Sequence, residues 1–184
     1  LTNMETLYVF KEFFNKTLGS DNIESRNDHI YLNTDKRENY LFNSSINGIE
    51  NSDFIFLIGS NPRYEATILN ARIRKAYLQN RMQIVSLNDV GDLTYPYKSL
   101  NGEIQKIKDI TDGNHEISSL ITNAKRPMII FGQSVFKSHN ARFIFETLKS
   151  YLIKKGKISN EWNSLNIISD NDSTVGSFDL GIYK

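Results

Sequence analysis

Hydrophobic residues along this chain fall into two alternating patterns, which predict strands and helices in turn. Short segments rich in apolar residues at 54–58, 83–87 and 128–131 are bounded by turn residues and are too brief for typical helices. Such runs are typical of strands buried on both faces of a parallel sheet. Between the first two runs, apolar residues recur every three or four positions from Tyr64 to Tyr77, as on one face of a helix. The order strand, helix, strand predicts a βαβ unit with parallel strands and a right-handed crossover.

The remaining periodic segments predict four further helices. They cover residues 4–18, 103–110, 115–124 and 140–153. Gly19 and Gly156 follow the first and the last of these, and glycine commonly ends a helix. Residues 20–39 are polar and predict a loop. The whole order predicts an α/β domain of three layers, with a mostly parallel sheet between helices.

Composition and charge narrow the possible functions. The chain has 184 residues, 39% hydrophobic and 23% charged, which is ordinary for one globular domain. Its formal net charge of +1 gives no electrostatic reason to expect binding to nucleic acid or to an anionic membrane. The absence of cysteine excludes disulfides, thiolate catalysis and cysteine-bound metal clusters within this sequence. No apolar run approaches the roughly 18 residues of a membrane span.

A turn of Gly59, Ser60, Asn61 and Pro62 joins the first strand to the following helix. Open α/β sheets bind ligands in loops at the carboxyl ends of their strands, and free N–H groups at a helix N-terminus attract anions. The turn therefore predicts an anion or nucleotide site. A plain strand-to-helix connection is the alternative, since serine and asparagine are good helix caps and proline suits a first helical turn. Pattern alone favours this alternative, because the glycine fingerprints of the dinucleotide-binding fold and of the P-loop are absent.

Charged side chains gather around the helix that follows this turn. They are Arg63, Glu65, Arg72, Arg74 and Lys75. Arginine donates hydrogen bonds in a planar fork, so Arg63 and Arg72 could hold a phosphate or the carboxylates of a partner protein. A salt-bridged helix surface exposed to solvent is the alternative, and spacing alone favours it.

The sequence predicts no catalytic residue and no metal site. His29, His115 and His139 lie far apart, and none has a metal-ligand spacing with another histidine or a carboxylate. The Gly-x-Ser-x-Gly pattern of a nucleophilic serine is absent as well.

Longer motifs in a fixed order resemble a known family. They are Tyr40-Leu-Phe-Asn-Ser-Ser-Ile-Asn-Gly-Ile-Glu, Gly59-Ser-Asn-Pro-Arg-Tyr-Glu-Ala, Asn70-Ala-Arg-Ile-Arg-Lys, Asp92-Leu-Thr-Tyr, Gly113-Asn-His, Ala124-Lys-Arg-Pro-Met, Trp162-Asn-Ser-Leu-Asn and Leu180-Gly-Ile-Tyr-Lys. With these motifs, the chain from residue 40 to its end resembles the C-terminal domain of the 75 kDa iron–sulfur subunit of respiratory complex I, the NADH:ubiquinone oxidoreductase. That domain is similar to molybdopterin-dependent oxidoreductases. Residues 1–39 fit less closely.

The resemblance implies a domain organisation and a set of site residues. Residues 40–184 would form a molybdopterin-oxidoreductase-like α/β domain, incomplete at its C-terminus, and residues 1–39 would be a helix and polar loop leading into it. A Gly-x-Asn-Pro turn helps hold the pterin dinucleotide in the molybdenum enzymes, whereas the complex I relatives generally carry no molybdenum. We therefore expect the turn at Gly59, Ser60, Asn61 and Pro62 to be a vestige that binds no cofactor. The candidate interface or structural residues are Arg63, Glu65, Asn70, Arg72, Arg74, Asp92 and Tyr95.

The resemblance also implies a function. The chain would be a non-catalytic structural subunit, or a fragment of a split subunit, in the peripheral arm of complex I. Iron–sulfur clusters and FMN would lie on partner chains, chiefly the cluster-bearing N-terminal part of the 75 kDa subunit and neighbouring peripheral-arm subunits. The location would be the matrix side of the mitochondrial inner membrane, or the cytoplasmic side of a bacterial plasma membrane, with no span of its own. Two alternatives remain: a fragment of an active molybdopterin-dependent oxidoreductase, and a stand-alone nucleotide-binding module.

Overall fold

A single parallel sheet forms the centre of the protein. The computed structural model describes residues 2–24, 31, 33–169 and 173–182. Within this part of the chain, five strands pair in the order β3-β2-β1-β4-β5, and every neighbouring pair is parallel. The strands are β1 (Phe54–Ile58), β2 (Gln83–Ser86), β3 (Lys98–Ser99), β4 (Pro127–Phe131) and β5 (Leu165–Ile167). The predicted α/β class and the three predicted strands are confirmed.

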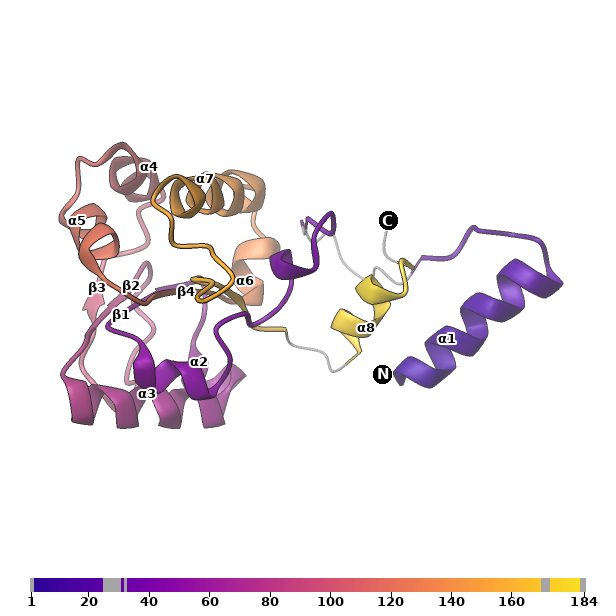
Figure 1. The fold of residues 1–184 in the computed structure, drawn as a ribbon, viewed down its shortest axis with the longest axis horizontal. Helices are drawn as coiled ribbons and strands as arrows, with labels where there is room; N and C mark the ends of the chain where they lie inside the picture. The colour runs from indigo at the N-terminus through magenta and orange to yellow at the C-terminus, as the bar shows by residue number, and fades with distance from the viewer. Residues whose placement is uncertain (1, 25–30, 32, 170–172, 183–184) are drawn as a thin grey trace.

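Helices cover both faces of this sheet and give the three predicted layers (Figure 1). One face carries α2 (Pro62–Glu65) and α3 (Thr67–Asn80), and the other carries α4 (Gln105–Asp112), α5 (Glu116–Asn123) and α7 (Ala141–Lys154). Successive residues of β1 point to opposite faces. Leu57 packs in one core with Ile73 of α3, whereas Phe56 packs in the other core with Leu148 of α7. All five residues of β1 and all five of β4 are buried, which explains their unbroken apolar runs.

The structure adds elements that the sequence pattern did not predict. The helix expected from Tyr64 is divided in two, because Ala66 leaves helical geometry with φ −152° and ψ 71° between α2 and α3. Strands β3 and β5 and the short helices α6 (Gln133–Phe136) and α8 (Thr174–Asp179) were not predicted. The expected helices over 103–110, 115–124 and 140–153 are present as α4, α5 and α7 with bounds shifted by one to two residues.

Residues 41–44 and two 3-10 turns, η2 (Arg37–Asn39) and η3 (Asn47–Asn51), lead into β1. Residues 41–44 and η2 lie against the free edge of β5, whereas η3 packs on α3. The Asn43 amide donates to the carbonyl of Leu165 at 2.6 Å. The Ser44 N–H donates to Oδ1 of Asn166 at 2.8 Å. These bonds leave β5 less open to edge pairing than a bare strand would be.

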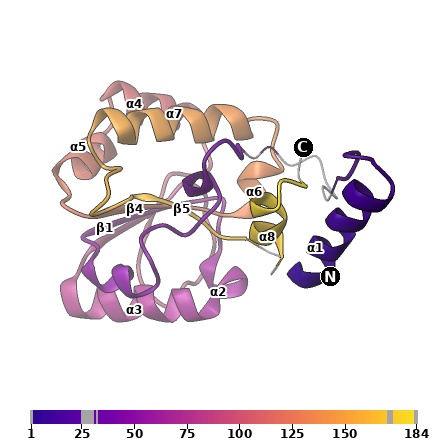
Figure 2. The same cartoon turned by 45° about the vertical axis from the view of Figure 1, so that its right-hand side comes forward.

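The N-terminal helix lies apart from the sheet and beside α8 (Figure 2). It comprises α1 (Met4–Glu12) and a continuing π-helical turn over Phe13–Thr17, close to the predicted span of 4–18. The Lys11 ammonium donates to the carbonyl of Leu180 at 2.6 Å, and Met4 packs against Gly176 of α8. Residues 25–30 and 32 of the loop predicted over 20–39 lie outside the described residues.

Candidate functional site

The turn after β1 lies where ligands bind in open parallel sheets. In the order β3-β2-β1-β4-β5, the connections that follow β1 and β4 leave toward opposite faces of the sheet. The carboxyl ends of these two strands therefore meet at a topological switch point. Gly59 follows β1 there, and Gly132 follows β4. The predicted turn is thus in the expected position for a ligand site.

The polar groups of this turn are already bound by a side chain of the same protein. The Ser60 hydroxyl donates to one carboxylate oxygen of Glu65 at 2.9 Å, and the Asn61 N–H donates to the other at 3.0 Å. Asn61 also caps α2, since its Oδ1 accepts the Arg63 N–H at 3.2 Å. A phosphate at this turn needs these donors and would meet the negative charge of Glu65.

Backbone contact between two glycines fills the switch point itself. A Cβ added at Gly132 would lie 2.2 Å from the carbonyl oxygen of Gly59 and 2.7 Å from Cα of Ser60. The Ser134 hydroxyl donates to the same Gly59 oxygen at 2.5 Å. Gly59 has a φ of +58°, and a Cβ there would lie 2.4 Å from a methyl group of Val135. The two loops therefore touch each other where a dinucleotide would enter.

The residues of this turn do not fit a pterin dinucleotide. Its hydroxyl and N–H donors are paired with Glu65, and the neighbouring space is occupied by the loop after β4. In the described part of the chain, no group of three or more histidine, cysteine or acidic residues could hold a metal ion. That part also has no helix that is both long and apolar enough to cross a membrane.

Four of the predicted interface residues make contacts around the loop after β2, two at the surface and two in the interior. Arg63 Nη1 lies 2.6 Å from Oδ2 of Asp92. Asn70 donates to the carbonyl of Leu93 at 3.1 Å and accepts the Tyr95 hydroxyl at 2.8 Å. Asn70 and Tyr95 are both buried. This network ties the loop after β2 to α2 and α3.

The pKa shifts of Tyr95 and Asp92 are consistent with their contacts around the loop after β2. Burial raises the pKa of Tyr95 far above its ordinary value, so its hydroxyl remains a donor at physiological pH. The Thr94 N–H and then the Arg63 guanidinium lower the pKa of Asp92, which keeps its carboxylate charged.

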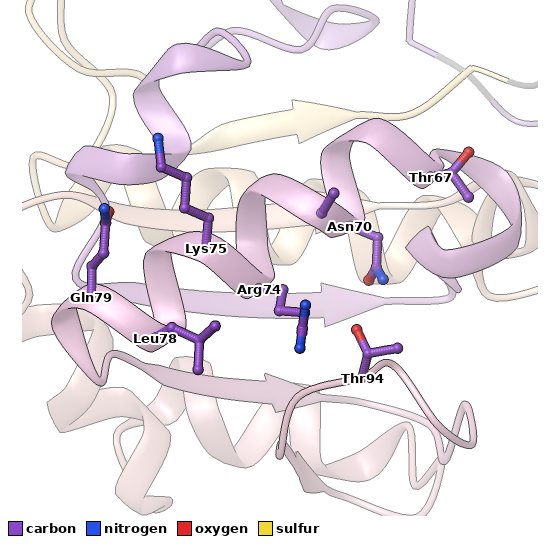
Figure 3. A pocket seen from close by; sticks show the side chains of 8 residues that line it. Thr67, Asn70, Arg74, Lys75, Leu78, Gln79 and Thr94 are labelled. Carbon is purple, nitrogen blue, oxygen red and sulfur yellow. The ribbon is translucent and has the colours of Figure 1, made fainter.

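The remaining charges on α3 divide into paired and unpaired groups. Glu50 of η3 accepts from Arg72 at 2.5 Å and from Lys75 at 2.9 Å. Lys75 and then Arg72 lower the pKa of Glu50 below its ordinary value. Arg74 has no acidic partner among the described residues. It borders an open hollow of about 490 Å³ and extends toward the loop that carries Thr94 (Figure 3).

Sequence reasoning missed the residues that close the switch point. Glu65 was a candidate interface or structural residue, but its bonds to Ser60 and Asn61 were not predicted, because they depend on α2 ending at Ala66. Gly132 had one sequence signal, its position directly after a buried strand, and Ser134 had none. Their contact with Gly59 spans more than seventy residues, so only the sheet order reveals it.

Comparison with known proteins identifies the family. The whole chain, residues 1–184, matches the molybdopterin oxidoreductase family. The chain belongs to this family. It is 36% identical over 196 residues to the NADH-ubiquinone oxidoreductase 75 kDa subunit of Reclinomonas americana, an alignment that covers 99% of the chain and 28% of that relative.

Two further relatives carry similar names. The chain is 32% identical over 182 residues to the NADH dehydrogenase [ubiquinone] iron-sulfur protein 1, mitochondrial, of Solanum tuberosum, covering 99% of the chain and 24% of the relative. It is 35% identical over 187 residues to the NADH-ubiquinone oxidoreductase 78 kDa subunit, mitochondrial, of Neurospora crassa, covering 98% and 25%. The chain thus spans about a quarter of the length of the curated relatives it matches.

Proposed function

We propose that this chain is a non-catalytic structural component of the peripheral arm of respiratory complex I. Similarity along almost the whole chain to complex I subunits from three organisms supports this assignment. Two of those relatives are named as mitochondrial, which supports a location at the mitochondrial inner membrane, on the matrix side. The chain would support electron transfer from NADH to ubiquinone by packing, as a subunit or as one piece of a split 75 kDa subunit.

The observation that carries the non-catalytic role is the occupied turn after β1. Glu65 binds the Ser60 hydroxyl and the Asn61 N–H, and Gly132 rests against the Gly59 carbonyl. A family member that used this turn for a cofactor would need those donors free. The closed turn therefore favours a packing role over an active molybdopterin enzyme and over a stand-alone nucleotide-binding module.

The redox centres of the assembly would lie on partner chains. This sequence contains no cysteine to ligate an iron–sulfur cluster. We expect the clusters and FMN on neighbouring subunits, above all on the cluster-bearing N-terminal part of the 75 kDa subunit. The exposed apolar side chains of α1, which include Val9 (63% exposed) and Phe10 (55% exposed), offer a surface for such packing.

A native gel of solubilised mitochondrial membranes tests this function. The gel is stained for NADH oxidation and probed for this chain, and the excised assembly is analysed for molybdenum and subunits. We expect the chain to migrate with the NADH-oxidising band together with cluster-bearing subunits and without molybdenum. Migration as a small free species would contradict the proposal. Molybdenum in proportion to this chain would instead favour the enzyme alternative.

A further inference from the structure

The outer face of α3 combines a free positive charge with exposed apolar side chains. Between Asn61 and Arg81 the sequence has five basic residues and one acidic residue, Glu65. Arg63, Arg72 and Lys75 pair with acidic side chains of this chain, and Arg81 stacks over the Tyr77 ring. Glu65 is used within the turn after β1. The guanidinium of Arg74 is therefore left as an available charge on this face.

Arg74 lies beside an open hollow lined by polar side chains. The open hollow beside it is also lined by the polar side chains of Thr67, Gln79 and Thr94, which make no hydrogen bond recorded among the described residues. Lys75 points away from Arg74 in Figure 3, toward the segment that carries Glu50. The hollow is thus positively charged and unoccupied by the acidic side chains of the chain itself.

A large apolar side chain also borders this hollow. Leu78 lines it and is 53% exposed. Leu78 follows Arg74 by one helical turn, so its side chain gives apolar contact area next to the Arg74 guanidinium.

We propose that this face of α3 binds an acidic segment of another protein, in which a carboxylate pairs with Arg74 and a neighbouring apolar side chain covers Leu78. An arginine fork and a carboxylate form two parallel hydrogen bonds, which gives such a contact direction as well as charge complementarity. The inference deepens the proposed structural role and rests on it, since it names one surface and the chemistry of the partner.

Other occupants fit this face less well. In a symmetric dimer through the same patch, two copies of a hollow with basic and no acidic side chains would meet, and like charges would oppose pairing. An anionic bilayer is bound by clusters of several free basic residues, whereas Arg72 and Lys75 are both held in ion pairs by the Glu50 carboxylate. The hollow between α3 and Thr94 also suits one projecting side chain better than a flat surface.

Carbodiimide coupling in the native assembly tests the identity of the occupant. The substitution Arg74→Lys keeps the positive charge and introduces an amine that the reagent joins to a carboxylate only at contact distance. We expect mass spectrometry to find position 74 joined to an aspartate or glutamate of a different protein, with apolar residues close to it in sequence. Coupling solely to this chain or to a second, isotope-labelled copy would overturn the inference, as would an assembled chain with no coupling at position 74.

Charge reversal measures what the contact contributes. We expect Arg74→Glu to lower the fraction of the chain found in the NADH-oxidising band by about tenfold, because like charges would meet at the contact. The matched control is Lys108→Glu, an exposed reversal on α4 across the sheet, with an expected change below about twofold. Equal fractions for the two variants would overturn the inference. Absence of the wild-type chain from the band would instead count against the proposed function itself.

Discussion

Two helical segments of equal length have opposite environments in this protein. Helix α7 has 14 residues and buries six of them, among them Phe145 and Leu148. The segment formed by α1 (9 residues) and the following π-helical turn (5 residues) buries none. Both show the same three- and four-residue apolar spacing in the sequence. The spacing thus predicts that a helix forms, but the surface that covers its apolar face depends on partners elsewhere in the fold or in another chain.

The comparison predicts its largest effect for a truncation in the core. Leu148→Ala should lower the free energy of unfolding by about 2–5 kcal/mol, because it leaves a cavity beneath α7. Val9→Ala on α1 should change it by less than about 0.5 kcal/mol. Urea unfolding followed by the fluorescence of Trp162, the single tryptophan, measures both. Similar losses for the two variants would show that α1 is packed in solution.

Adding one methyl group to Gly132, beside the sheet, and to Gly176, which faces α1, extends this comparison. Gly132→Ala should cost about 1–3 kcal/mol, since its Cβ would strike the backbone of Gly59 and Ser60. Gly176→Ala in α8 should be close to neutral, because its Cβ would meet only the flexible end of Met4 and alanine favours a helix. Thermal unfolding compares the two variants. A Gly132→Ala protein as stable as the wild type would mean that the loops after β1 and β4 are not in close contact at the switch point.

Removing one tyrosine hydroxyl from the interior and one from α1 should give a smaller difference in the free energy of unfolding. Tyr95→Phe leaves the buried Oδ1 of Asn70 without its donor and should cost about 1–2 kcal/mol. Tyr8→Phe on the exposed face of α1 should have almost no effect. Urea midpoints of the two variants decide this, and equal midpoints would remove Tyr95 from the network that holds the loop after β2.

The smallest predicted effect concerns pH and the contact that holds α8. The Arg37 guanidinium, and further the Tyr40 hydroxyl, lower the pKa of Asp179 below its ordinary value. A lowered pKa means that this contact stabilises the protein at pH values above the ordinary aspartate range and is lost as pH falls through the lowered pKa. Carbon NMR of the Asp179 carboxyl group should show its pKa rising in Arg37→Ala. An unchanged titration would show that Arg37 does not pair with Asp179 in solution.

The sequence predicted the elements whose apolar spacing is clear within the element itself. The apolar runs of β1, β2 and β4 and the periodic helices α3 and α7 belong to this class. Strand β3 has two polar residues, and α8 has a glycine and no clear period, so neither carries a local signal. Membership of the molybdopterin oxidoreductase family was likewise predicted correctly from ordered motifs.

The candidate site was predicted in position but not in detail. The turn at Gly59 follows directly from the end of a buried strand. Its closure depends on the backbone break at Ala66 and on Gly132 in a distant loop, and neither contact has a local pattern. The pairing of Arg63 with Asp92 is equally remote in sequence. The role of these residues at an interface stays a prediction, and Arg74 is the one whose charge the described fold leaves available.

The claim that this chain acts by packing can be tested most directly at the turn after β1. The measurement is the rate of NADH oxidation by ubiquinone per assembled complex, in membranes that carry the chain with Ser60→Ala and Asn61→Ala together. These changes remove the Ser60 hydroxyl and the Asn61 side-chain amide, two polar groups of the turn, and leave the Asn61 N–H in place. We predict an unchanged rate per assembled complex, even if slightly less chain is assembled. A loss of about tenfold or more with assembly intact would contradict the account, because it would mean that the turn contributes to the reaction itself.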